Sequence, residues 1–325
     1  MKLASETDAA ILTVTMNPAV DVATSVPRLL PGVKLRCDTA QTDPGGGGVN
    51  VARVVTRLGG RCRALVVAGG AMGEQLLSLM AAEGVAAIPF RIAQQTRQNF
   101  AVTESDTGQQ YRFILPGPVV DDVEGDRILA EIADRASDLG PACFVVLSGS
   151  FPPGLAPDFV AQCVTRLHPQ GHRLCLDTSG DALRHLVGHP TDPPYLLRMD
   201  QQEAEQLRGT TLSGVAETAD YAAELVRRGV AEVVVLGCGA DGSVMATADA
   251  RYLCRAAKVP VVSTTGAGDS FMGALVLALA RGEAPEQALR WGVAAASAAV
   301  MTHGTELCES GAVADLLEQC EVAAI

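Results

Sequence analysis

The feature that most constrains this chain is a regular alternation of short apolar runs with helical patterns. The runs are bounded by turn residues and resemble buried strands. They span residues 11–16, 64–70, 143–150, 173–179, 195–199 and 232–237. Between them, residues 49–60 and 74–84 carry apolar side chains at the spacing of an amphipathic helix. This alternation predicts a mainly parallel sheet covered by helices on both faces.

Two segments interrupt the alternation. Residues 20–44 and residues 98–115, which include the turn sequence SDTG, alternate apolar and polar side chains. Such alternation is typical of half-exposed antiparallel strands. We expect the two inserts to pair into a small second sheet that covers a ligand cleft as a lid. Its exposed face could equally bury against a second copy of the chain. The prediction is one α/β domain over residues 1–325 with these two lid inserts.

Charge and cysteine content bear on partners and location. The formal net charge is −12, so a nucleic-acid backbone would be repelled over most of the surface. The nine cysteines form no CxxC pair, which favours neither a disulfide framework nor a zinc site. No apolar run is long enough to cross a bilayer, and the first residues lack the apolar region of a signal peptide. We therefore expect a cytoplasmic protein without nucleic-acid or membrane partners.

The stretch STTGAGDSFMG, residues 263–273, places a carboxylate in a glycine turn directly before an apolar helix pattern. Converging backbone N–H groups and the positive end of a helix make such a turn a site for an anion, most readily a phosphate. A carboxylate at this point could accept the proton of a hydroxyl that attacks phosphorus. The alternative is that Asp269 only caps the helix.

A second glycine turn, PGGGGVNVARV at residues 44–54, also opens a helix pattern. Four consecutive glycines lose much backbone entropy on ordering, which indicates that a ligand approaches the main chain closely. Asn50, in the first helical turn, could form a hydrogen bond with a ligand hydroxyl. Alternatively, the run is a loop that only lets a strand and a helix meet.

The sequence GCGADG, residues 237–242, matches the G-x-G-x-x-G pattern after a predicted strand. A dinucleotide site needs a helix next, but the following residues predict a β-hairpin. The turn therefore remains a candidate border of a mononucleotide site. No P-loop sequence is present.

Few basic residues lie in the inserts. Lys34 and Arg36 stand in the first insert, and Arg97 lies at the edge of the second. If the inserts pair, these cations converge over the cleft and match a phosphate group on the substrate. Taken singly, each is a solvated surface charge. The pairs His168 with His172, and His185 with His189, lack an acidic partner pattern, and we interpret them as surface residues rather than metal ligands.

In their order, these stretches resemble the ribokinase-like (PfkB) family of carbohydrate kinases from about residue 11 to residue 310. PGGGGVNVARVVTRLGG and STTGAGDSFMGAL match the signature pair of that family, and both together at this separation are highly specific. Six shorter stretches resemble sequences of the bacterial minor-type 6-phosphofructokinases: NPAVD, KLRC, TRQNF, QYRF, LSGSFPPG and LDTSG. The resemblance implies a ribokinase-like three-layer α/β sandwich with a small β-sheet lid.

The resemblance also implies a reaction, the transfer of a phosphoryl group from MgATP to the C1 hydroxyl of fructose 6-phosphate. Asp269 would be the general base. Backbone N–H groups of the turn would stabilise charge on the transferring group, namely those of Gly266, Ala267 and Gly268. Motif matching implies contacts to the sugar or its phosphate from Asp21, Lys34, Gly46, Gly47, Asn50, Arg97 and Ser148. A homodimer through the lid and potassium near the GAGD turn are implied as well.

For ATP, motif matching implicates three glycines: Gly237, Gly239 and Gly242. One departure from the family concerns the same site, because Arg198, Met199 and Asp200 stand where Lys-Pro-Asn is usual. Glu203 follows and would contact magnesium indirectly. The resemblance places Arg198 and Asp200 beside the nucleotide, where the Asp adds negative charge near the triphosphate. We expect altered ATP or metal affinity rather than lost activity.

Alternative functions stay open at this point. The rival substrates are fructose 1-phosphate, tagatose 6-phosphate, and an unphosphorylated sugar or nucleoside. The kinases of the first two usually carry a lysine within the glycine run, where this chain has only glycines. From a different class, the chain could be a non-catalytic sugar-phosphate sensor. The intact Asp269 distinguishes the two readings, because a pure binder has no use for a carboxylate beside a phosphate.

Overall fold

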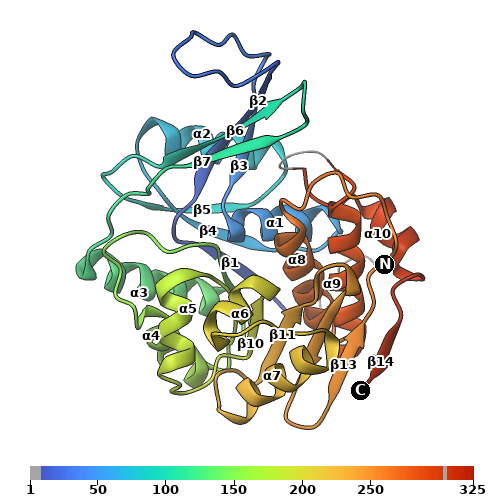
Figure 1. The fold of residues 1–325 in the computed structure, drawn as a ribbon. Helices are drawn as coiled ribbons and strands as arrows, with labels where there is room; N and C mark the ends of the chain where they lie inside the picture. The colour runs from blue at the N-terminus through green and yellow to red at the C-terminus, as the bar shows by residue number, and fades with distance from the viewer. Residues whose placement is uncertain (1–8, 303–305) are drawn as a thin grey trace.

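The computed structural model describes residues 9–302 and 306–325, and its middle layer is a ten-stranded sheet (Figure 1). From one edge to the other, the strands are β14 (Val322–Ala324), β13 (Arg251–Cys254), β12 (Ser243–Ala246), β11 (Val233–Gly237), β10 (Leu196–Met199), β9 (Arg173–Asp177), β8 (Phe144–Ser148), β1 (Ile11–Thr15), β4 (Arg63–Ala68) and β5 (Ala87–Arg91). The strands from β11 to β5 are parallel, and β12, β13 and β14 pair antiparallel. The predicted, mainly parallel sheet is confirmed.

Helices cover both faces of this sheet, as the alternating pattern predicts. One face packs against α3 (Asp122–Asp138), α4 (Phe159–Leu167), α5 (Gly180–Gly188), α6 (Gln201–Arg208) and α7 (Val215–Arg227). The other packs against α1 (Gly47–Arg57), α2 (Gly70–Ala82), α8 (Ala267–Ala280), α9 (Pro285–Ala299) and α10 (Ser310–Leu317). Two single-turn helices, η1 (His168–Gln170) and η2 (Gly239–Asp241), lie in connections. Within the described chain, no helix is long and apolar enough to cross a membrane.

Helix α8 is apolar on all sides because other elements surround it. Every residue from Ser270 to Ala280 is buried, as expected for a helix without a solvent face. Two glycines allow this close packing. A side chain at Gly273 would come within 2.7 Å of Val54 on α1, and one at Gly292 on α9 would come within 2.9 Å of Phe271. The first turn of α8 is therefore held in a fixed position beside α1.

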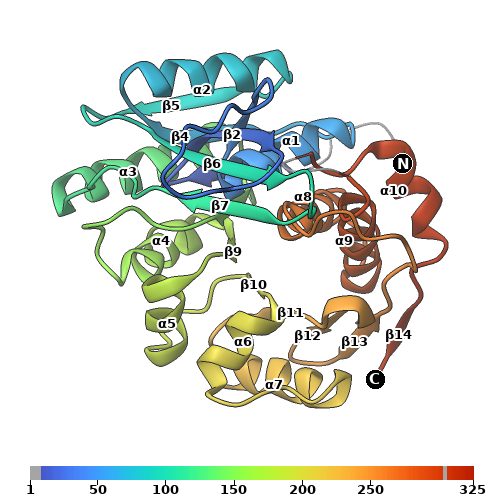
Figure 2. The same cartoon turned by 45° about the horizontal axis from the view of Figure 1, so that its top comes forward.

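A separate sheet of four strands lies above the carboxyl ends of the parallel strands (Figure 2). Its order is β3 (Gln41–Gly45), β2 (Ala19–Val26), β6 (Arg97–Glu104) and β7 (Gln110–Ile114). The predicted pairing of the two inserts is confirmed, but the expectation of antiparallel strands is wrong for one pair, since β2 and β6 run parallel. The reason is that β2 follows β1 and β6 follows β5, so both leave the same end of the parallel sheet.

Candidate active site

Three adjoining hollows lie at the carboxyl ends of the parallel strands, and lid residues line the first of them. Their volumes are about 340 Å³, 180 Å³ and 850 Å³. The first two share Gly149 and Asp269, and the last two share Arg198 and Gly268. Asp269 therefore lies on the wall between the first and second hollows, next to the third.

The hollow of about 340 Å³ opens beneath the lid. The structure brings together five of the predicted sugar contacts on its wall: Asp21, Gly46, Gly47, Asn50 and Arg97. Two lining residues, Asn99 and Arg112, are not among the predicted site residues. Asn99 donates a hydrogen bond to Asp21 Oδ1 at 2.8 Å. Strand periodicity could have identified it, because residues two apart on a strand point to the same face and Asn99 follows Arg97 by two.

Charges at the lid side of this hollow offset one another. Burial raises the pKa of Asp21, while the hydrogen bond from Asn99 and the charges of Arg97 and Arg112 lower it. Arg97 itself donates to the carbonyl oxygens of Leu115 at 3.1 Å and Asn17 at 3.0 Å. These bonds hold its guanidinium in place at the mouth of the hollow. A carboxylate with two nearby guanidinium groups can bind both a hydroxyl and an anion.

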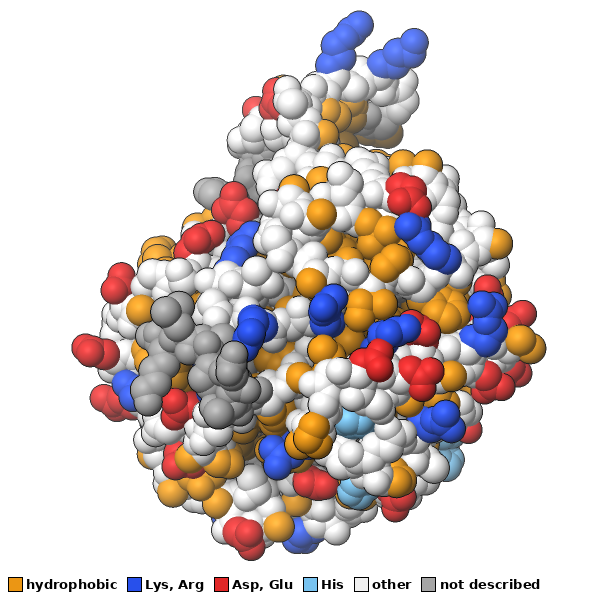
Figure 3. All heavy atoms as spheres, turned by 180° about the vertical axis from the view of Figure 1, so that it is seen from behind, with side chains coloured by type: hydrophobic (Ala, Val, Ile, Leu, Met, Phe, Trp, Pro, Cys, Tyr) orange, Lys and Arg blue, Asp and Glu red, His pale blue; other side chains and the backbone are white. Residues whose placement is uncertain are grey.

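The two other predicted cations stand apart from this group. Lys34 and Arg36 lie in the exposed segment 27–40 between β2 and β3, and neither lines any of the three hollows. Basic side chains project from the end of the lid in the rear view (Figure 3). In a single chain, the basic residues that line the hollow beneath the lid are therefore Arg97 and Arg112.

The first turn of α8 carries the candidate base. Its N-cap is Gly266, with φ of 76°, and Asp269 is the acidic residue of this turn, where its charge also favours the positive end of the helix. Asp269 Oδ2 accepts a hydrogen bond from Asn50 Nδ2 on α1 at 2.8 Å. A side chain at Gly266 would come within 2.7 Å of Leu307 Cδ2, so the turn requires glycine on two counts.

The ionisation of Asp269 suits proton transfer near neutral pH. Burial and the negative charge of Asp177 raise its pKa to about 6, against the opposing effects of Asn50, Arg198 and Arg53. A general base is most effective when its pKa is close to the working pH. The N–H groups at the start of α8, including those of Ala267 and Gly268, have no acceptor four residues earlier in the helix. They can therefore bind an anion directly beside the carboxylate.

The glycine run before α1 is needed for packing. A side chain at Gly46 would come within 2.7 Å of Thr15, and one at Gly47 within 2.4 Å of Ser148 Oγ. The run therefore lets α1 begin directly against β1 and β8. Ser148 is only 3% exposed, and its hydroxyl has no hydrogen-bond partner among the described residues. It lines the hollow of about 180 Å³, where a ligand could satisfy it.

Acidic side chains surround that second hollow. Asp177, Glu203 and Asp269 all line it, together with Arg198. Burial and the charges of Asp200 and Asp177 raise the pKa of Glu203 to about 7. No group of three or more His, Cys, Asp or Glu side chains in the described ranges is arranged to hold a metal by itself. Asp177 was not among the predicted site residues, although it ends a predicted strand at the sheet edge where ligands bind.

Asp200 has a structural role at the start of α6. Its side chain accepts a hydrogen bond from Glu203 N at 2.8 Å, and the Glu203 carboxylate accepts one from Asp200 N at 2.9 Å. This reciprocal pair is a capping box. The Asp that departs from the family pattern therefore holds Glu203 in place.

The largest hollow, about 850 Å³, has the size and lining of a nucleotide site. The predicted residues Arg198, Asp200, Gly237, Gly239 and Gly242 all line it. Its other wall is largely apolar and comes from α8 and α9 and from the segment that precedes α8, with Val261, Phe271, Val293, Ala296 and Val300. After the GCGADG turn, the chain forms the antiparallel pair β12–β13, so the predicted hairpin is confirmed.

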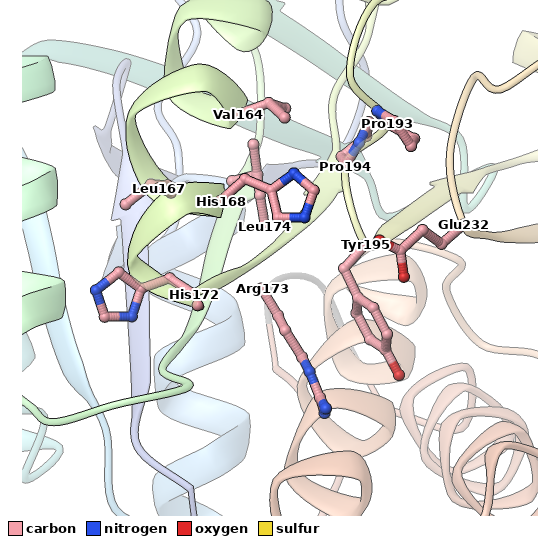
Figure 4. A pocket seen from close by; sticks show the side chains of 11 residues that line it. Val164, Leu167, His168, His172, Arg173, Leu174, Pro193, Pro194, Tyr195 and Glu232 are labelled. Atoms are coloured by element: carbon pink, nitrogen blue, oxygen red, sulfur yellow. The ribbon is translucent and has the colours of Figure 1, made fainter.

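A further hollow, of about 350 Å³, lies at the opposite ends of β9 and β10 (Figure 4). There the Arg173 guanidinium lies 5.2 Å from the ring centre of Phe144 and 5.0 Å from that of Tyr195. His168 is exposed beside this hollow, whereas His172 is only 6% exposed. The prediction that His172 is a surface residue is wrong, because it lies just before the buried strand β9. In Figure 4 its ring points away from Arg173.

Comparison with known proteins gives a consistent result. The family model described as "pfkB family carbohydrate kinase" matches residues 11–311. A protein named ATP-dependent 6-phosphofructokinase isozyme 2 from Mycobacterium tuberculosis is 41% identical over 301 residues, covering 92% of this chain and 86% of that protein. One named 1-phosphofructokinase from Escherichia coli is 32% identical over 295 residues, covering 89% and 90%.

Solved structures match over nearly the whole length. Phosphofructokinase-2 from Escherichia coli in complex with potassium superposes with a TM-score of 0.88 at 34% identity, covering 96% of this chain and 99% of that one. The structure of the same enzyme with fructose-6-phosphate superposes with a TM-score of 0.86 at 33% identity and the same coverage. The three-layer sandwich and its lid sheet are therefore shared with these proteins.

Proposed function

Because the chain belongs to the pfkB family of carbohydrate kinases, we propose that it transfers the γ-phosphoryl group of ATP to the C1 hydroxyl of fructose 6-phosphate, giving fructose 1,6-bisphosphate. One observation carries the proposal. Asp269, whose pKa is raised to about 6, lies in the wall of a sugar-sized hollow and next to a nucleotide-sized one. A carboxylate in that position can take the proton of a hydroxyl that attacks phosphorus.

The reaction follows from the groups around Asp269. The sugar hydroxyl gives its proton to the carboxylate as its oxygen bonds to the γ-phosphorus, and the bond from that phosphorus to the bridging oxygen of ADP breaks. The N–H groups at the start of α8 donate to the transferring phosphoryl oxygens and stabilise their charge. These groups come from Gly266, Ala267 and Gly268. The same short segment thus supplies both the base and the anion site.

Recognition of the sugar phosphate is assigned to the lid side of the hollow of about 340 Å³. Asp21, oriented by Asn99, accepts from sugar hydroxyls, while Arg97 and Arg112 face the phosphate. The backbone of Gly46 and Gly47 lets the sugar approach α1 closely, and the unpartnered hydroxyl of Ser148 donates to the ligand. Lys34 can join this set only when the segment 27–40 of a moved lid, or of a second copy, reaches the cleft.

ATP would occupy the largest hollow, with its adenine against the apolar wall and its phosphates toward Gly268. The family implies a divalent cation, and we propose magnesium. The donor set fits a hard cation shared with the triphosphate, since carboxylate oxygens of Asp177 and Glu203 line the adjoining hollow. When bound, the cation supplies neutralisation of the phosphate charge. Potassium is proposed as a second cation near the GAGD turn, on the basis of the relative solved with potassium.

Assembly and location are also part of the proposal. The edge strand β7 is exposed along its whole length and carries Tyr111, Phe113 and Ile114, with 40%, 50% and 55% of their surfaces accessible. An exposed apolar edge strand favours pairing with another chain. We propose a homodimer through the lid and a cytoplasmic location.

One other function has a specific observation in its favour. Since a relative named 1-phosphofructokinase is 32% identical, fructose 1-phosphate is the rival substrate. The test is ADP release with MgATP and a panel of fructose 6-phosphate, fructose 1-phosphate, tagatose 6-phosphate, fructose and ribose. We expect the fastest turnover on fructose 6-phosphate, and loss of turnover in Asp269→Asn. Faster turnover on another sugar would replace the substrate, and binding without ADP release would indicate a sensor.

A further inference from the structure

A line of hydrogen bonds connects the end of α2 with the carboxylate of Asp269 through two residues of α1. Glu83 Oε2 accepts from Arg53 Nε at 2.9 Å, and Glu83 Oε1 lies 2.7 Å from Arg53 Nη2. Arg53 Nη1 donates to Asn50 Oδ1 at 3.0 Å, and Asn50 Nδ2 donates to Asp269 Oδ2 at 2.8 Å. Arg53 is only 2% exposed, so water competes little for these bonds.

The chemistry of the groups fixes the direction of this line. A guanidinium can only donate hydrogen bonds, so the side-chain oxygen of Asn50 must face Arg53. The amide nitrogen of Asn50 then faces Asp269, which accepts. If the amide were flipped, its oxygen would face a carboxylate and its nitrogen would face a donor, and both contacts would be unfavourable. Arg53 therefore determines which end of the amide meets Asp269.

We propose that Arg53 is a positioning residue for the phosphoryl transfer, because it sets the amide of Asn50 and thereby the orientation of the Asp269 carboxylate. The inference rests on the proposed function in one respect, that Asp269 is the base. With Oδ2 engaged by Asn50, the other oxygen, Oδ1, is the one that receives the proton of the sugar hydroxyl. Arg53 acts on the base only through Asn50 and does not itself touch the reacting atoms.

A second contact of Arg53 strengthens the same conclusion. Its Nη1 also donates to the carbonyl oxygen of Pro44 at 3.2 Å, the residue directly before the glycine run. One buried guanidinium thus orients both the turn that borders the sugar hollow and the amide that touches the base. Two parallel contacts with the Glu83 carboxylate hold the Arg53 guanidinium in one orientation, as is usual for a bidentate arginine–carboxylate pair.

The charged groups around Asp269 set the sign of the expected change. Asp177 on β9 raises its pKa, and Arg198 on β10 and Arg53 on α1 lower it, as does the hydrogen bond from Asn50. Glu203 on α6 lines the adjoining hollow. A substitution that keeps the charge of Arg53 but frees the Asn50 amide removes the hydrogen bond alone. The pKa of Asp269 then rises.

Helix α1 offers a matched control one turn further on. Arg57 Nη2 pairs with the same Glu83 oxygen, Oε2, at 3.0 Å. None of its hydrogen bonds or ion pairs within the described residues involves Asn50. Arg57→Lys therefore perturbs the same carboxylate and the same helix, but not the line to the base.

The experiment compares kcat, KM and the pH profile of kcat in four variants, Arg53→Lys, Arg57→Lys, Asn50→Ala, and Arg53→Lys combined with Asn50→Ala. For Arg53→Lys we expect kcat to fall roughly ten- to a hundredfold, as for a misplaced catalytic group. We also expect the acid limb of the pH profile, the part in which kcat falls as the pH decreases, to move to higher pH. Arg57→Lys should keep the kcat and the acid limb of the parent protein. In the Asn50→Ala background, Arg53→Lys should cause no further loss of kcat and no further shift of the acid limb, although KM can still change through the contact with Pro44.

Three outcomes would overturn the inference. These are an unchanged acid limb in Arg53→Lys, an equal fractional loss of kcat in both backgrounds, or an equal loss in Arg57→Lys. If thermal unfolding shows that Arg53→Lys does not fold, Glu83→Gln takes its place, because it weakens the two contacts between Glu83 and Arg53 while leaving Arg53 present. The same shift, smaller in size, is then expected, and its absence contradicts the inference.

A measurement without substrate separates this inference from the proposed function. The carboxyl carbon of Asp269 can be titrated by NMR in protein labelled with ¹³C-aspartate, with the signal assigned by its loss in Asp269→Asn. A higher pKa in Arg53→Lys than in Arg57→Lys supports the positioning role even if no sugar is phosphorylated. Equal titration in the two variants overturns it even if fructose 6-phosphate is a good substrate.

Discussion

Arg198 Nη1 lies 3.2 Å from Asp177 Oδ1, on the wall that separates the nucleotide-sized hollow from the hollow that contains Asp269. The pair is mostly shielded from water, with 18% and 11% of the two side chains exposed. The same guanidinium covers the first turn of α8, since a side chain at Gly268 would come within 2.7 Å of Arg198 Nη1. Arg198 therefore connects Asp177 at the end of β9 to the first turn of α8, the proposed anion site.

Removing Arg198 should affect both stability and the ionisation of the base. In Arg198→Met, Asp177 is left without its cation, and we expect the free energy of unfolding to fall by about 2 kcal/mol. The negative charge of Asp177 then raises the pKa of Asp269 without the opposing effect of Arg198. The acid limb of the kcat profile should therefore move to higher pH. Urea unfolding and a pH profile measure the two effects. Arg198→Lys, which restores a cation, should recover most of the stability, and an equal loss in both variants would contradict this account.

Activity should fall on the acid side with the titration of Asp269. Its pKa of about 6 lies above the ordinary value of 3.8, so the carboxylate is disfavoured in the folded protein. Below about pH 6 we expect kcat to decrease tenfold per pH unit as the base becomes protonated. A kcat that stays constant down to pH 5 would exclude this carboxylate as the base.

The raised pKa of Asp269 also predicts that the folded protein gains stability at acid pH, where its activity is lost. A raised carboxyl pKa lowers the stability of the folded state above the unfolded-state pKa, and this cost disappears as the pH falls toward 4. Asp269→Asn should therefore be inactive yet more stable than the parent protein at pH 8, by about 1–2 kcal/mol, because contact with water in the hollow reduces the full effect. At pH 4 the two proteins should unfold at the same urea concentration. Higher stability of the parent at pH 8 would refute the prediction.

The two ends of α8 allow a paired test of the anion turn. Gly266 and Gly282 both have left-handed backbone angles, φ of 76° and 78°. Alanine at Gly282 should cost about 1 kcal/mol of stability through backbone strain, and alanine at Gly266 should cost more, because its side chain would also come within 2.7 Å of Leu307. Only Gly266→Ala should also reduce kcat, by at least about tenfold, because it shifts the N–H groups that face the phosphoryl group. Equal kcat in the two variants would show that the turn does not take part in the reaction.

Selection for a phosphorylated sugar should depend on the guanidinium groups of the cleft. Arg97→Ala and Arg112→Ala should lower kcat/KM for fructose 6-phosphate by at least about tenfold and leave the low activity on fructose nearly unchanged. Arg91, which pairs with Glu74 on the outer side of the large sheet, provides the control. Lys34→Ala tests the projecting segment, and the same loss of selectivity there would mean that this segment reaches a cleft in the working enzyme. An unchanged preference in all three variants would refute the phosphate role.

Substitution of the residue that departs from the family pattern should have a modest effect. Asp200→Asn keeps a side-chain oxygen for the capping box, so the stability of α6 should change little. Removing the charge should increase the affinity for MgATP, by a few-fold, and change the dependence on magnesium concentration. A magnesium titration that does not distinguish the two proteins would contradict this expectation.

Much of the fold follows from local pattern. The six apolar runs become parallel strands because each has buried faces on both sides, which leaves a strong signal in the sequence. The direction of β2 relative to β6 could not be read in this way. It depends on where each insert leaves the large sheet, and alternation of side chains is the same for parallel and antiparallel pairs.

The site could be predicted only in part. The glycine turns stand out because few other arrangements need such residues, and the structure brings Asp269, Asn50 and Asp21 to one cleft. Asn99 could have been found from strand periodicity, whereas Arg112 depends on the register of β7 with β6, which is a property of the folded sheet. The link from Glu83 to Arg53 joins two helices, and nothing in the spacing of those two residues along the chain indicates it.

The position of the lid relative to the helices separates two tasks within one cleft. The groups proposed to carry out the transfer belong to α8 and α1, which are held in the core by close contacts at glycines. The groups proposed to recognise the sugar, Asp21, Asn99, Arg97 and Arg112, belong to strands of the lid, which also contacts α1 and α2 through Val20 and Pro44. Changes in the lid can therefore alter the choice of acceptor while the transfer chemistry stays intact, so that new specificities are accessible by substitution within its four strands.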